Sequence, residues 1–102
     1  TMRGAQKTGG KEYLQPAVGI GRIGSTATAV VGNATTVQPQ SNGFLTLWPS
    51  NATRPLIATS NYAAFTNFNR YFTVGVGTDG AFKRFALTTT DLVIDVSGYF
   101  AP

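Results

Sequence analysis

Apolar and polar residues alternate in short runs along this chain, and turn residues separate the runs. The clearest run is the last one, where Leu92, Ile94 and Val96 alternate with the residues between them. Because the side chains of a strand point in turn to its two faces, this pattern predicts a strand. A Gly-aromatic-aromatic sequence follows directly, and we predict that residues 92–100 form the closing strand of a β domain.

The same pattern predicts further strands earlier in the chain. They cover residues 17–23, 26–31, 33–37, 44–48, 56–60, 71–77 and 81–87. Gly32 is expected to be a break or bulge, and Asn42-Gly43 and Thr78-Asp79-Gly80 are expected to be hairpin turns. Short strands at this spacing predict an all-β fold, a single sandwich of about seven to nine mostly antiparallel strands.

The predicted strand at 44–48 is apolar on both of its faces. Phe44, Thr46 and Trp48 share one face, and two leucines share the other. A strand of this kind is usually buried on both sides, which favours a core or subunit-contact position. The alternative is that Trp48 stacks on a sugar ring, because aromatic faces suit carbohydrates as well as cores.

The front of the chain differs from the rest. Residues 1–15 are polar and contain Gly9-Gly10, so we expect an extended N-terminal arm, followed by the sandwich domain at 16–102. Exposed sheet edges accept an added strand, and the arm could donate one to a neighbouring subunit. The candidate donor-strand residues are Tyr13, Leu14, Val18, Ile20 and Ile23. The alternative is that the same segment completes its own sheet.

Composition narrows the function classes. The chain has 102 residues, which is one domain, and only 12% of them are charged. The net charge of +4 is partly in the first eleven residues and otherwise scattered, whereas a nucleic-acid binder concentrates basic residues on one face. No run approaches the roughly 18 apolar residues of a membrane span. We therefore expect neither a nucleic-acid partner nor membrane insertion.

The reactive side chains are few. The chain has no Cys and no His, which excludes disulfides, thiolate or imidazole metal sites and Ser-His or Cys-His catalysis. The acids are Glu12, Asp79, Asp91 and Asp95. The last two lie about 13 Å apart along one strand, too far for a paired-carboxylate site. We expect no catalytic residue, no metal, no cofactor and no enzymatic activity.

The start of the chain suggests export, and an exported protein can carry glycans. Asn33 and Asn51 each begin an Asn-x-Thr sequon and are candidate glycosylation sites, with Asn51 in a turn the better one. Thr1 precedes Met2, which suggests a cut chain or a longer precursor.

Five sequence blocks resemble a recurrent β-rich domain of bacterial secreted and cell-surface proteins, often found at the C-terminal end of larger exported chains. The blocks are 43–50 (GFLTLWPS), 53–55 (TRP), 59–61 (TSN), 76–80 (VGTDG) and 91–100 (DLVIDVSGYF). The resemblance covers about residues 27–101 and implies an extracellular all-β module without established catalytic residues. Such domains usually have a longer N-terminal part, which residues 1–25 do not match.

Two functions are consistent with these observations. The first is an extracellular structural subunit that assembles with copies of itself into a fibre or surface layer, by exchange of the N-terminal strand. The alternative is a carbohydrate- or cell-wall-binding module of a larger exported protein.

Overall fold

The computed structural model describes residues 2–7, 9–17 and 26–101, and these contain eight strands and no helix. The strands are β1 (Met2–Lys7), β2 (Glu12–Pro16), β3 (Ala29–Val37), β4 (Gly43–Pro49), β5 (Ser60–Tyr62), β6 (Phe68–Gly75), β7 (Ala81–Ala86) and β8 (Thr90–Phe100). The closing strand and most of the other predicted strands are confirmed. The strand predicted at 17–23 lies outside the described residues except for Ala17.

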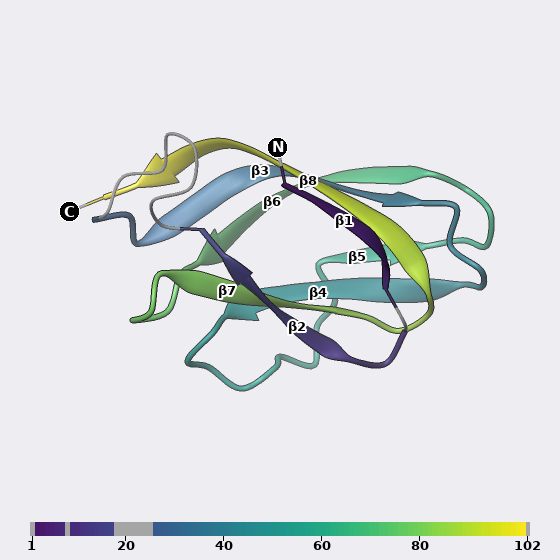
Figure 1. Ribbon diagram of the computed structural model, residues 1–102, viewed down its shortest axis with the longest axis horizontal. Coiled ribbons are helices and arrows are strands. Elements are labelled where there is room, and N and C mark those ends of the chain that lie inside the picture. The colour runs from purple at the N-terminus through teal and green to yellow at the C-terminus, as the bar shows by residue number, and fades with distance from the viewer. Residues whose placement is uncertain (1, 8, 18–25, 102) are drawn as a thin grey trace.

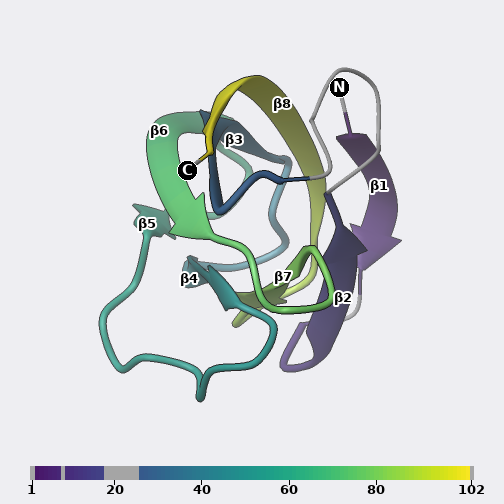
Figure 2. The same cartoon turned by 90° about the vertical axis from the view of Figure 1, so that its left-hand side faces the viewer.

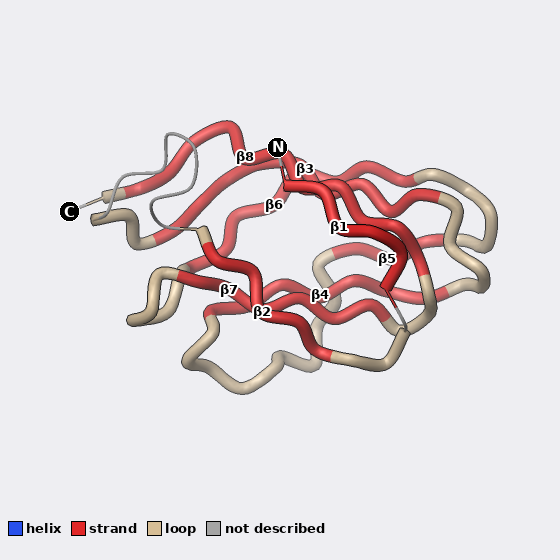
Figure 3. Tube along the Cα trace, viewed as in Figure 1, coloured by secondary structure: helices blue, strands red, loops and turns tan. Residues whose placement is uncertain are grey.

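The strands form two four-stranded antiparallel sheets that pack face to face (Figures 1 and 3). Sheet A has the order β1-β8-β3-β6, and sheet B has the order β2-β7-β4-β5. Figure 2 shows β1 and β2 together on one flank of the sandwich, and β5 and β6 on the other. The predicted all-β sandwich is therefore confirmed.

Most connections cross from one sheet to the other, because only β4 and β5 are consecutive strands of one sheet. The prediction of hairpins at Asn42-Gly43 and at Thr78-Asp79-Gly80 is therefore wrong, although both segments do reverse the chain. Gly80 has the positive φ (75°) that such turn residues supply, and its N–H bonds to the Gly77 carbonyl at 2.9 Å. The residues of a turn reverse the chain locally. The sheet that the next strand joins depends on where the apolar face of that strand is buried.

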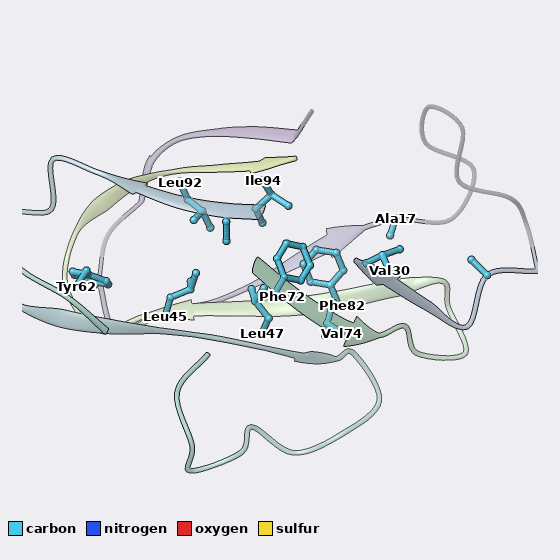
Figure 4. Close-up of a cluster of buried hydrophobic side chains, with 12 residues drawn as sticks. Ala17, Val30, Leu45, Leu47, Tyr62, Phe72, Val74, Phe82, Leu92 and Ile94 are labelled. Atoms are coloured by element: carbon cyan, nitrogen blue, oxygen red, sulfur yellow. The ribbon is translucent and has the colours of Figure 1, made fainter. Parts of the chain in front are cut away.

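Alternation places the core between the sheets. In β3, buried and half-buried residues alternate along the whole strand. Figure 4 shows the buried side chains from both sheets pointing toward one another. They include Leu45, Leu47, Tyr62 and Phe82 from sheet B, and Phe72, Leu92 and Ile94 from sheet A. At one end, the Tyr62 hydroxyl donates to the Thr88 carbonyl at 3.0 Å and fastens β5 to the β7–β8 connection.

Gly32 lies where the register of β3 and β8 shifts, but the extra residue there is Ser97 of β8. The break or bulge expected at Gly32 is therefore wrong, since β3 runs unbroken from Ala29 to Val37. A Cβ atom at this position would lie 2.0 Å from the Asp95 carbonyl oxygen. The close approach of the two backbones therefore requires glycine here.

The strand predicted at 56–60 is wrong, since β5 begins only at Ser60. Leu56 and Ile57 are almost fully exposed in the β4–β5 connection, which lies below sheet B in Figure 1. Pro55 cannot donate a ladder hydrogen bond, and only Thr59 and the residues after it reach β4.

The N-terminal segment contributes one strand to each sheet of its own chain. β1 pairs with β8, and β2 pairs with β7, both antiparallel and both at a sheet edge. Tyr13 and Leu14 lie in β2, opposite Arg84 and Lys83. The other donor-strand candidates, Val18, Ile20 and Ile23, lie outside the described residues.

Candidate functional site

The outer face of sheet A carries a row of three polar or aromatic residues across three strands. Tyr71 of β6 lies opposite Asn33 of β3, which in turn lies opposite Asp95 of β8. These residues occupy strand positions between core residues and therefore point away from the core. Tyr71 is 81% exposed, so its ring is free on the surface.

A shallow groove of ≈ 380 Å³ is lined in part by Tyr71. Its lining residues are uncharged: Val31, Gly32, Tyr71, Phe72, Thr73 and Ser97. The β3–β8 register shift at Gly32 and Ser97 is part of this lining, so the irregular register contributes directly to the shape of the face.

Neighbouring polar side chains are held in place by hydrogen bonds. The Asn69 side-chain amide donates to the Thr35 hydroxyl at 3.0 Å, one row from Tyr71. The Ser97 hydroxyl donates to the Val31 carbonyl at 3.4 Å. The face therefore presents an aromatic ring together with amide, hydroxyl and carboxylate groups. The aromatic ring can stack on the apolar face of a ligand, and the polar groups can form hydrogen bonds with the hydroxyl groups of that ligand.

Trp48 is only 2% exposed, so the alternative in which it stacks on a sugar is wrong. Residues 45–48 of β4 are all buried, as the apolar character of both faces predicts. The β4–β5 connection folds back over the outer side of sheet B, where the Arg54 guanidinium carbon lies 3.8 Å from the centre of the Phe85 ring. Arg54 also reaches Glu12 of β2, with 3.7 Å between Nη1 and Oε2.

The four acids are dispersed over the molecule. Glu12 lies in β2, Asp79 lies in the β6–β7 turn, and Asp91 and Asp95 lie in β8. Among the described residues, no three acidic side chains gather where they could hold a metal ion. No helix in this part of the chain is long and apolar enough to cross a membrane.

Asp79 has a structural partner in Ser50, whose hydroxyl donates to its carboxylate. This hydrogen bond, followed by one from the Ala81 N–H, lowers the pKa of Asp79 below its ordinary value. Ser50 and Asp79 belong to two of the sequence blocks described above, so these blocks meet in one turn. Their partnership stabilises the β6–β7 turn.

Arg84 is an arginine on the inner side of β7. It is 9% exposed, and its Nε has no hydrogen-bond partner within the part of the chain that the structure describes. Its guanidinium carbon lies 5.7 Å from the centre of the Tyr13 ring, so β2 covers it. Burial lowers the pKa of Arg84, with a smaller opposing effect from Tyr13.

The two sequons lie in different environments. Asn51 is exposed in the turn after β4, which suits modification, and Asn33 is half-buried within β3, as expected for a strand residue.

Sequence reasoning missed Tyr71 and Arg84 as residues of interest. Alternation could have placed Tyr71 on an outer face, but only the fold shows that its ring is exposed there. Comparison with family models, with curated proteins and with solved structures gave no match.

Proposed function

We propose that this chain is a non-catalytic, extracellular module that binds polysaccharide through the outer face of sheet A. The observation that carries the proposal is the exposed Tyr71 ring and the uncharged groove that Tyr71 helps to line. Aromatic stacking supplies contact area, and the surrounding amides and hydroxyls supply directional hydrogen bonds.

The charges around this face favour a neutral glycan over a polyanion. No Lys or Arg lines the groove, and the charged residue in the Tyr71 row is the acidic Asp95. A nucleic acid or a strongly acidic polymer needs basic groups, and the residues that line the groove supply none.

The closed sandwich is also consistent with this role. Both sheets are complete with strands of the chain itself, so the domain can present its binding face without a neighbour. Extracellular location follows as part of the proposal, because polysaccharide is the main material of cell surfaces and is met outside the cell.

The test is pull-down of the protein by insoluble polysaccharides, with peptidoglycan, chitin and cellulose as probes. We expect Tyr71→Ala to weaken retention on at least one of them by about tenfold, which corresponds to about 1.4 kcal/mol. The matched control is Tyr99→Ala. Tyr99 is 44% exposed but lies opposite the core residue Val30, on the other side of sheet A.

Equal loss of retention in both variants, or no retention of the unmodified protein on any probe, would overturn the proposal. Because Tyr71 is so exposed, its variant should keep the melting temperature of the parent, and circular dichroism checks this.

A further inference from the structure

Strands β1 and β2 with the residues between them form one unit, here called the N-terminal arch (residues 2–7 and 9–16). β1 pairs with residues 90–94 and β2 with residues 81–85. In the connection, the Gly9 N–H donates to the Thr89 hydroxyl at 3.1 Å, and the Gly10 N–H donates to the Ala86 carbonyl at 2.9 Å. The arch therefore recognises one continuous segment of the chain, residues 81–94.

The arch is stacked closely on the connection between β7 and β8. A Cβ atom at Gly9 would lie 2.5 Å from the Thr88 Cα, and Gly10 has a φ of 82°. The two glycines let the N-terminal arch lie against the β7–β8 connection at backbone contact distance. These contacts are made by main-chain atoms. Because every copy of the protein has the same main chain, another copy offers the arch the same contacts.

β2 contributes little to the hydrophobic core. Leu14 is 53% exposed, and Tyr13 and Gln15 are half-buried. The strand is held by ladder hydrogen bonds to β7 rather than by buried apolar area. Units held in this way open at a lower free energy than the core strands.

Arg84 lowers further the free energy that is needed to separate β2 from β7. In the closed chain its Nε is buried beneath β2 without a hydrogen-bond partner among the described residues. A buried polar group without a partner costs free energy, and departure of β2 would let water reach it.

The chain between the arch and β3 is long enough to allow exchange. The eleven residue steps from Ala17 to Thr28 span at most about 36 Å when extended, which exceeds the 25 Å middle dimension of the molecule. We propose that the arch exchanges between copies, so that the arch of one protomer pairs with residues 81–94 of another. Reciprocal exchange gives a closed dimer, and head-to-tail exchange gives an open chain, the basis of a fibre or layer.

The test uses two single-cysteine variants of the full chain, which has no cysteine of its own. Leu14 and Lys83 are register partners on β2 and β7, so exchange of the arch holds Leu14→Cys of one copy beside Lys83→Cys of another. The two variants, one of them carrying a mass tag, are unfolded and refolded together at high concentration and then oxidised. We expect a mixed disulfide dimer on a non-reducing gel.

The control mixture pairs Leu14→Cys with Leu87→Cys, since Leu87 is similarly exposed (45%) but lies outside the β2–β7 register. Exchange predicts several-fold more mixed dimer from the register pair than from the control pair. Equal yields from the two mixtures would overturn the proposal. This result is independent of glycan binding, because Tyr71 is on another strand and another face.

Discussion

At the residue scale, Trp48 and Tyr71 show that the same kind of strand position is buried in one sheet and exposed in the other. Both are aromatic residues that point away from the space between the sheets, yet Trp48 is 2% exposed and Tyr71 is 81% exposed. The outer sides of the two sheets differ as well, since the β4–β5 connection folds back over sheet B with Arg54 on Phe85. Trp48 is therefore a packing residue, and Tyr71 is the residue for which we propose a role in recognition.

Replacement of Trp48 tests this division. We expect Trp48→Ala to lower the free energy of unfolding by about 3–5 kcal/mol, the usual cost of removing a large buried aromatic side chain. Urea denaturation measures the loss. Tyr71→Ala serves as the comparison and should change stability by less than about 0.5 kcal/mol; equal losses in the two variants would contradict the assignment.

At the element scale, several of the recognisable sequence blocks turn out to build turns and connections. Arg54 of the 53–55 block covers Phe85, and the Thr59 hydroxyl accepts a hydrogen bond from the Leu47 N–H at 3.0 Å. Ser50 and Asp79 join two further blocks in the β6–β7 turn. The blocks therefore explain how the sandwich is held together and leave the Tyr71 face unexplained.

The Asp79 turn has a pH dependence whose sign follows from the lowered pKa. The ionised carboxylate is favoured in the folded state, so its contribution to stability is present above the ordinary pKa of Asp and disappears as the pH falls through the lower, folded-state pKa. We expect Asp79→Asn to melt below the parent at pH 7, and the two to converge at about pH 2. A difference that stays constant or grows in acid would contradict this role.

The sequence predicted the strands better than it predicted the connections between them. Alternation located β3, β4, β7 and β8 to within a few residues, because one or both faces of each are buried. It failed at Leu56 and Ile57, where apolar residues lie in an exposed connection. Assignment of strands to sheets and the exposure of Tyr71 could not be predicted, since both depend on contacts between segments far apart in the chain.

At the scale of the whole molecule, the chain is a closed sandwich with one uncovered, chemically mixed face and one weakly attached arch. The face is built from the middle strands β8 and β3 and the edge strand β6 of sheet A, and strand positions suit a surface that must keep its shape. The arch lies on the flank formed by β1 and β2 (Figure 2), away from Tyr71 on the edge strand β6. The proposed glycan binding and the proposed exchange of the arch therefore use separate parts of the molecule.

The central claim is that the outer face of sheet A binds polysaccharide, and backbone amide chemical-shift mapping tests it most directly. Soluble oligosaccharides from the polysaccharide that retains the protein are titrated into the ¹⁵N-labelled chain. The account predicts saturable shifts grouped on Asn33, Tyr71, Thr73 and Ser97, which lie together on this face. Saturable shifts grouped on sheet B or on the arch, with the Tyr71 face unchanged, would contradict it.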